Sequence, residues 1–320
     1  MDAIGGYFDL ELRRGKHFHE NALRLNTARN CFEYVLRARK YSKVYMPYYT
    51  CEVMFQPLEK LSVQYECYHI DFNFELTELP ILKSDEAILY TNYFALKQKY
   101  IQQLVRHYGN RLIIDNAQAF YAKPVEGIDT FYSARKFFGV PDGAYLYTEC
   151  ILDEDFEQDI SIDRMLHLLK RIEFSAEAGY QDFRMADNSL DNQPIRWMSK
   201  LTEALLCNID YVTVEERRIR NFKFIHEFLK NKNSISDLWL GDNDVPLCYP
   251  YRTENKYTRG VLLKNKIYTP IYWQNVIDDY NCLNNEALVS KEIIPIPVDQ
   301  RYTEINLENI LKYECSRQTY

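Results

Sequence analysis

The sequence predicts an α/β fold with a mostly parallel central sheet flanked by helices, followed by a smaller C-terminal α+β region. Short apolar stretches alternate with helix-length segments along the first two thirds of the chain, which is the pattern of parallel βαβ units. In Leu112-Ile113-Ile114, successive residues are apolar, as expected of a strand covered on both faces. The content of 47% hydrophobic and 27% charged residues suits a globular chain.

The elements of the first part are expected in alternating order. Strands are predicted at 43–46, 63–70, 87–90, 111–114, 130–132 and 144–147, and helices at 28–39, 51–60 and 97–107. Beyond these, helices are expected at 194–207, where Pro194 suits a first helical position, and at 212–230. A turn-rich stretch at 231–244, a strand at 292–296 and a closing helix at 307–313 follow. We therefore predict two domains, residues 1–210 and 211–320.

Composition and charge exclude several classes of function. The net charge of −7, with no basic stripe, argues against a protein whose main task is binding nucleic acid. There is no signal-peptide pattern and no apolar run of the ~20 residues that a membrane helix needs, so a cytoplasmic location is expected. The eight cysteines form no CxxC pair, and the histidines, His17 and His19 included, have no ligand spacing. We expect reduced thiols and no metal site.

The most informative stretch runs from Arg111 to Phe120, where an apolar strand leads into Asp115. Open α/β sheets bind their ligands at the carboxyl ends of their strands, which is where this carboxylate lies. A buried carboxylate there is costly unless a cation pairs with it. The alternative interpretation is an aspartate that merely caps the following turn.

A second stretch, from Phe131 to Gly143, places Lys136 between bulky apolar residues. Burial disfavours the ammonium form of a lysine, and a neutral amine can attack an aldehyde. Ser133, three residues earlier, would supply a hydroxyl to a phosphate beside that lysine. The alternative is an ordinary surface lysine.

A third stretch, Arg24 to Asn30, opens the first expected helix. Free backbone N–H groups and the helix dipole at such a start favour phosphate binding. A plain N-cap at Asn26 or Thr27 explains the same residues equally well. A phosphate site, a carboxylate at a strand end and a buried lysine are together what pyridoxal phosphate requires.

The sequence resembles the DegT–DnrJ–StrS family of sugar aminotransferases, which have the type I fold of pyridoxal-phosphate enzymes. The resemblance extends over nearly the whole chain. It is carried by Asn26-Thr27-Ala28, Met46-Pro47-Tyr48-Tyr49-Thr50, Asp115-x-Ala117-Gln118-Ala119, the Ser133 and Lys136 block with Gly143, Gly179 to Met185, and Ile294-Pro295-Ile296-Pro297 before Arg301-Tyr302.

The resemblance implies a role for each site residue. Lys136 would be the Schiff-base lysine, and Asp115 the partner of the pyridine nitrogen. Gln118 would touch the 3-hydroxyl of the ring, and Thr27, Ala28 and Ser133 would hold the phosphate. Gly179 to Met185 would reach the site of a neighbouring subunit, which implies a homodimer.

The chain also departs from the family pattern. Relatives usually carry serine five residues before the lysine, where this chain has Phe131. Many have an aromatic residue that stacks on the cofactor ring where this chain has Cys51, so Tyr48 or Tyr49 is considered for that contact. Gln181-Asp182 replaces a common asparagine in the segment expected to reach the partner.

The resemblance implies an aminotransferase that moves an amino group from an amino acid such as glutamate to a nucleotide-linked keto-sugar. A sugar dehydratase is a second hypothesis, although the relatives that dehydrate sugars replace the lysine with histidine. A non-catalytic or regulatory protein on the same scaffold is the third, because a fold does not fix a function.

Overall fold

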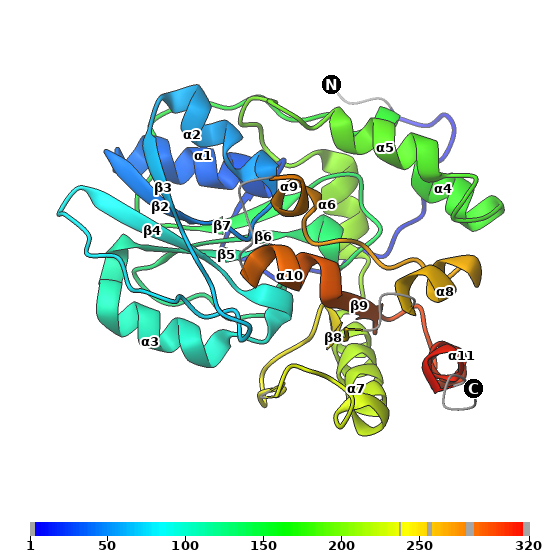
Figure 1. Cartoon of the computed structure of the whole chain (residues 1–320). Helices are drawn as coiled ribbons and strands as arrows, with labels where there is room; N and C mark the ends of the chain where they lie inside the picture. Colours follow the sequence, from blue (N-terminus) through cyan, green and yellow to red (C-terminus); the bar gives the residue numbers. More distant parts are fainter. Residues whose placement is uncertain (1–3, 237, 255–257, 280–284, 316–320) are drawn as a thin grey trace.

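The structure is a computed structural model that describes residues 4–236, 238–254, 258–279 and 285–315. Its centre is a seven-stranded sheet in the order β1-β7-β6-β5-β4-β2-β3 (Figure 1). The strands are β1 (Leu23–Leu25), β2 (Lys43–Pro47), β3 (Gln64–Tyr68), β4 (Glu86–Thr91), β5 (Leu112–Asn116), β6 (Asp129–Ser133) and β7 (Ala144–Tyr147). The run from β3 to β6 across the sheet is parallel, whereas β7 is antiparallel to β6 and β1 to β7. The prediction of a mostly parallel sheet is confirmed.

Helices cover both faces of this sheet. In Figure 1, α1 (Ala28–Arg39) and α2 (Gln56–Leu61) lie on one face, and α3 (Gln98–Tyr108) lies on the other. The central strands β4 and β5 are buried at every position, which explains why their residues are apolar in succession. The apolar side chains of the two faces form separate clusters, one around Phe32 and Val35 and the other around Tyr90 and Leu104.

The segment after the main sheet differs from the prediction. The helix expected at 194–207 begins only at Lys200, because Ser199 caps α6 (Lys200–Cys207). The carbonyl of Pro194 instead accepts hydrogen bonds from the side-chain amides of Asn26 at 3.0 Å and Asn30 at 2.6 Å, which hold this stretch against the start of α1. The prediction of a helix starting at Pro194 is therefore wrong.

Two helices that the sequence did not predict, α4 (Leu166–Glu173) and α5 (Tyr180–Asn188), form a hairpin that projects from the body (Figure 1). Helix α4 has no buried residue, and α5 buries only Ala186. The hairpin exposes several large apolar side chains, among them Ile172, Phe174 and Met185. These exposed apolar residues of the hairpin are therefore not part of the core of the single chain.

The C-terminal part is a small α+β unit. The strands β8 (Cys248–Arg252) and β9 (Ile293–Pro297) pair antiparallel. They pack with α7 (Tyr211–Leu229), α8 (Thr258–Lys264) and α11 (Glu304–Cys315), while α9 (Gln274–Asp278) and α10 (Asn285–Glu292) lie between them and the main sheet (Figure 1). The boundary at residue 210 falls at the N-cap of α7, and the division into two domains stays a prediction.

Two further expectations concern membranes and cysteines. Across the described part of the chain, every helix is too short or too polar to cross a bilayer. Six cysteines, at 31, 51, 67, 150, 207 and 248, are free thiols, whereas Cys282 lies outside the described residues.

Candidate active site

The candidate site begins at the carboxyl edge of the main sheet. Thr91 ends β4, and Asp115 and Ser133 lie at the ends of β5 and β6. Thr91 is in register with Asp115, and Asp115 with Phe131. The structure thus brings the Asp115 block and the lysine segment, which begins at Ser133, to the same edge of the sheet, as the sequence predicted.

Asp115 is 4% exposed and uses its two oxygens differently. Oδ1 accepts a hydrogen bond of 2.8 Å from the backbone N–H of Ala117, so this oxygen caps the turn, while a role of Asp115 at a cofactor stays a prediction. Oδ2 accepts only a long bond of 3.4 Å from the hydroxyl of Thr91. Burial raises the pKa of Asp115 to about 6, and the hydrogen bonds and the charge of Lys136 oppose this rise. Oδ2 is therefore a buried acceptor without a strong donor.

Lys136 ends a short 3₁₀ turn, Ala134–Lys136, that follows β6 directly. Its side chain is exposed in the single chain, so the expectation of a buried lysine is wrong. The reason is that Phe137 and Phe138 point into the core, where they pack around Phe120, and this leaves the lysine on the open side of the turn. Its Nζ lies 5.9 Å from the ring centre of Tyr272.

The charge of Lys136 acts on both Asp115 and Cys51. Burial raises the pKa of the Cys51 thiol, and the charges of Lys136 and Arg29 lower it. Cys51 is half-buried and precedes the 3₁₀ turn Glu52–Met54. The charge of Lys136 thus lowers the pKa of both Cys51 and Asp115, in opposition to burial.

Tyr49, considered as a ring-stacking residue, does not face this region. It is fully buried, and its ring packs against Tyr93 at 5.5 Å and Trp273 at 4.7 Å between centres. The ring of Tyr48 lies against His69, with 5.5 Å between centres. The assignment of Tyr49 to a cofactor ring is therefore wrong in this arrangement, because its faces are already covered.

Gln118 is buried and belongs to the framework behind the site. Its Oε1 accepts a bond of 2.8 Å from the backbone N–H of Phe94, a residue with a positive φ of 56°. This bond holds the turn Tyr93–Ala95 after β4. Contact of Gln118 with a cofactor stays a prediction.

The start of α1 has the features of an anion site. Thr27 caps the helix, since its Oγ1 accepts a bond of 3.2 Å from the N–H of Asn30. The side chain of Thr27 thus acts as an N-cap, and its contact with a phosphate stays a prediction. The next two amides, those of Ala28 and Arg29, have no acceptor within the described chain. They remain free to bind an anion.

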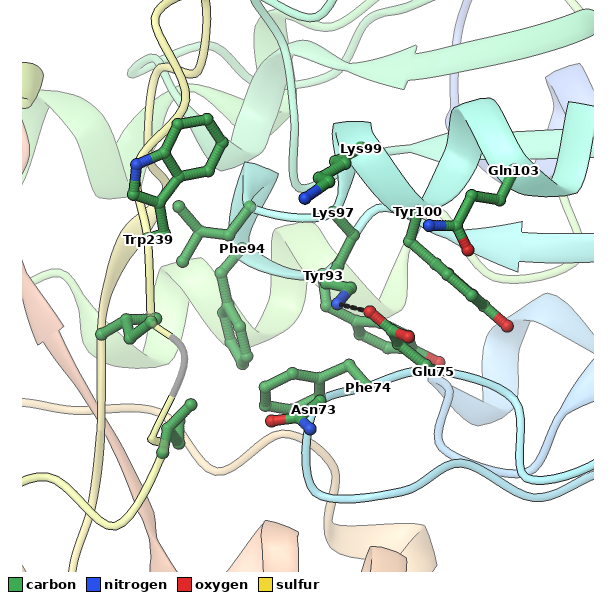
Figure 2. A pocket seen from close by; sticks show the side chains of 13 residues that line it. Asn73, Phe74, Glu75, Tyr93, Phe94, Lys97, Lys99, Tyr100, Gln103 and Trp239 are labelled. Carbon is green, nitrogen blue, oxygen red and sulfur yellow. Dashed lines mark hydrogen bonds and ion pairs between the residues drawn. The ribbon is translucent and has the colours of Figure 1, made fainter.

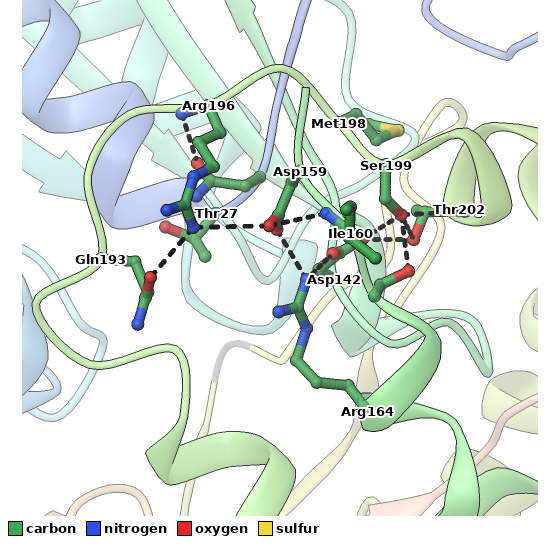
Figure 3. Close-up of polar contacts among 12 residues, drawn as sticks. Thr27, Asp142, Asp159, Ile160, Arg164, Gln193, Arg196, Met198, Ser199 and Thr202 are labelled. Atoms are coloured by element: carbon green, nitrogen blue, oxygen red, sulfur yellow. Dashed lines mark hydrogen bonds and ion pairs between the residues drawn. The ribbon is translucent and has the colours of Figure 1, made fainter. Parts of the chain in front are cut away.

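A buried polar network fixes the far end of the lysine segment (Figure 3). The guanidinium of Arg164 donates to Asp142 at 2.5 Å and to Asp159 at 2.6 Å. Asp142 also accepts from the hydroxyls of Thr202 and Ser199 at the start of α6. Asp142 is fully buried, and burial raises its pKa while Thr202 and Arg164 oppose the rise. The network joins the lysine segment to the base of the α4–α5 hairpin.

Sequence reasoning missed four charged residues beside Lys136. Arg135 pairs with Asp187 at 2.8 Å, and Arg29 pairs with Asp191. Two signals in the sequence could have pointed to the arginines. Arg135 is next to Lys136, and Arg29 lies in the first turn of α1. Their partners lie more than 50 residues away in the chain, where only the fold reveals them.

A separate cavity of about 470 Å³ is lined in part by Tyr93 and Phe94 of the turn Tyr93–Ala95 (Figure 2). Its walls include Phe94, Tyr100 and Trp239, and Lys97 pairs there with Glu75 at 2.5 Å. Lys136 and Asp115 do not line it. It is a different place from the candidate active site.

Solved structures similar to this chain include a sugar aminotransferase and other aminotransferases. The sugar aminotransferase CalS13 from Micromonospora echinospora matches with a TM-score of 0.63 over 92% of this chain and 87% of its own, at 14% identity. The chain has the fold of this aminotransferase. AtS13 from Actinomadura melliaura matches with a TM-score of 0.60 over 93% and 86%, at 15% identity.

The same fold occurs in PseC from Helicobacter pylori, an aminotransferase involved in the biosynthesis of pseudoaminic acid. It matches with a TM-score of 0.56 over 91% of this chain and 85% of its own, at 14% identity. No family model matches the sequence, and no curated protein is similar to it. The type I fold predicted from the resemblance is thus confirmed by structure alone.

Proposed function

We propose that the protein is a pyridoxal-phosphate-dependent aminotransferase that transfers an amino group from an amino acid, glutamate in the first instance, to a nucleotide-linked keto-sugar. The observation that carries the proposal is the placement of Asp115 near the end of β5 and of Lys136 just after the neighbouring parallel strand β6. The fold shared with CalS13 and PseC supports it, as does the similar structure of NtdA from Bacillus subtilis with bound cofactor PMP.

The residues present fit the cofactor. The Oδ2 atom of Asp115 lacks a strong donor, which a protonated pyridine nitrogen would supply. The free amides at the start of α1 suit a phosphate, with the Ser133 hydroxyl as an additional ligand. Lys136 is the amine at the same edge of the sheet. In place of a stacking aromatic ring, the chain offers Cys51.

The cofactor, when bound, supplies an electron sink for the carbon that carries the amino group. Asp115 would keep the pyridine nitrogen protonated, and its burial strengthens this interaction because little water competes. Lys136 would hold the cofactor through its Nζ and then, as a free amine, carry a proton between donor and cofactor carbons. The Arg164 network would keep the lysine segment in place during both half-reactions.

We further propose that the protein acts as a homodimer. The α4–α5 hairpin carries the Gly179 to Met185 segment and leaves Ile172 79% exposed and Phe174 75% exposed. Contiguous apolar side chains of this size are typical of a surface that packs against another protein. A second copy over this hairpin would also enclose Lys136, which the single chain leaves open.

The non-catalytic alternative is favoured by one observation, the exposure of Lys136 in the single chain. The retained lysine counts against a sugar dehydratase. Absorption spectroscopy distinguishes the three hypotheses, which are the aminotransferase, the sugar dehydratase and the non-catalytic protein. We expect a yellow protein whose visible band disappears with glutamate and returns with a keto-sugar nucleotide from a panel. A protein that takes up no cofactor would support the scaffold hypothesis, and a cofactor band that glutamate leaves unchanged would contradict transamination.

A further inference from the structure

The α5 region places two carboxylates on the arginines beside Lys136. Asp187, in the last turn of α5, pairs with Arg135, the residue before the lysine. Asp191, just after α5, pairs with Arg29 in the first turn of α1. Two cations next to the candidate site are thus neutralised by one peripheral element.

The members of these pairs differ in exposure. The arginine side chains are 11% exposed for Arg29 and 20% for Arg135, whereas the carboxylates are 41% exposed for Asp191 and 49% for Asp187. A guanidinium that is mostly shielded from water favours a nearby anion, because an unpaired charge is costly there. A half-exposed carboxylate, in contrast, can return to water at little cost. The arginines are therefore the fixed members and the carboxylates the exchangeable ones.

The surroundings point to one positive region. Burial raises the pKa of Asp187, but the charges of Arg135, Lys136 and Arg29 outweigh burial, and the pKa is lowered overall. Arg29 and Lys136 both also act on Cys51. The free amides at the start of α1 belong to the same side of the molecule as Arg29. Asp187 thus lies where positive charge from two elements converges.

We propose that Arg135 and Arg29 form a binding subsite for an oxyanion, phosphate or carboxylate, and that Asp187 and Asp191 occupy it as internal competitors until the ligand displaces them. Guanidinium groups suit both anions, since they donate in a planar fork. The inference concerns the same site as the proposed function, but oxyanion binding needs no turnover, so the two stand or fall separately.

Calorimetric titration of the cofactor-free full chain with inorganic phosphate tests the proposal. The double variant Asp187→Asn with Asp191→Asn should bind phosphate about fivefold more tightly, because two exposed ion pairs no longer compete. Arg135→Gln should bind it more weakly. Asp182→Asn is the matched control, because Asp182 lies on the same helix but pairs with Lys170 at 2.7 Å. Equal or weaker phosphate binding by the double variant would overturn the proposal.

A second titration, with 2-oxoglutarate as probe, identifies the source of the oxyanion. If the cofactor phosphate fills the subsite, the double variant loaded with pyridoxal phosphate should bind phosphate and 2-oxoglutarate no more tightly than the loaded wild type does. If the carboxylate of the amino donor fills it, loaded protein keeps tighter 2-oxoglutarate binding in the double variant. Both outcomes support displacement of the carboxylates. No effect in the cofactor-free or the loaded protein contradicts it, whether or not the protein transaminates.

Discussion

Asp115 lies near the end of β5 and Lys136 just after the adjacent parallel strand β6, and the charge of the lysine acts on the buried carboxyl group of the aspartate. The two residues contrast in exposure, since Asp115 is 4% exposed and Lys136 is open to solvent. Both residues lie at the edge of the sheet where β5 and β6 end, so an acid and an amine occur at the same edge.

Replacement of Lys136 by alanine should abolish turnover but leave the fold intact. Exposed side chains outside caps and networks usually change the free energy of unfolding by less than about 0.5 kcal/mol. We therefore expect an unchanged midpoint in urea, together with the loss of the cofactor label that borohydride fixes on the wild-type chain. Peptide mass spectrometry of the reduced protein locates the label.

Lys99 provides the control for this experiment. It is an exposed lysine on α3, and it lines the separate cavity of Figure 2. Lys99→Ala should keep both label and turnover. Undiminished turnover in Lys136→Ala would refute the assignment of the Schiff-base lysine.

Asp115→Asn should stabilise the cofactor-free protein while weakening cofactor binding. The pKa of Asp115 is about 6 in the folded chain and near 3.8 when unfolded, so the folded state disfavours ionisation. The resulting stabilisation is complete below pH 4 and is lost as the pH rises towards 6. At pH 7.5 the free energy of unfolding of the variant should exceed that of wild type by up to about 3 kcal/mol, since one pKa unit corresponds to about 1.36 kcal/mol.

Urea unfolding at pH 4 and pH 7.5 measures this difference, and cofactor titration measures affinity. The gain should appear at pH 7.5 and shrink at pH 4, where the wild-type carboxyl is also largely neutral. Wild-type cofactor affinity in the variant would show that this carboxylate does not serve the ring nitrogen. A variant less stable than wild type at pH 7.5 would contradict the cost of the buried charge.

The sequence predicts the local features of this molecule well and its long-range pairings poorly. Helix 28–39 was predicted at the bounds that α1 has, because Thr27 and the apolar spacing both indicate it. The strand ending in Asp115 was predicted because both faces of β5 are covered. The exposure of Lys136 was not predicted, because the direction of the Phe137 and Phe138 side chains depends on their packing against Phe120.

The misplaced helix at Pro194 has a similar cause. The amides of Asn26 and Asn30, more than 160 residues earlier, bind the Pro194 carbonyl and compete with helix formation. The pairing of Arg29 with Asp191 spans 162 residues. No local spacing encodes such contacts, so the charged residues around the lysine became visible only in the fold.

Protonation of His19 should lower the free energy of unfolding of the protein in mild acid. Burial lowers its pKa from 6.5 to about 4, with partial opposition from the Phe120 carbonyl, to which Nε2 donates at 2.8 Å. Stability is therefore complete above pH 6.5 and is lost as the pH falls from 6.5 to 4, because the unfolded chain binds the proton more readily. The loss from this group amounts to about 3 kcal/mol.

Urea midpoints of wild type and His19→Gln between pH 7.5 and 4.5 check this. The variant should be less stable at pH 7.5, because the ring packs 4.2 Å from that of Tyr132, but it should lose less stability on acidification. His107→Gln, an exposed position on α3, should follow the wild-type curve. Parallel curves for wild type and His19→Gln would exclude His19 as the cause.

Arg164→Gln should destabilise the fold and loosen the lysine segment. Removal of the guanidinium leaves the buried carboxylate of Asp142 without a cation, which costs about 3 kcal/mol in comparable buried pairs, and leaves Asp159 with Arg196 alone, at 3.6 Å. We expect a lower urea midpoint and a lower cofactor affinity, and Asp142→Asn in the same chain should restore part of both by removing one unpaired charge. Arg171→Gln, exposed on α4, serves as the control and should match wild type. If Arg164→Gln lowers the midpoint but binds cofactor as tightly as wild type, the network stabilises the fold without positioning Lys136.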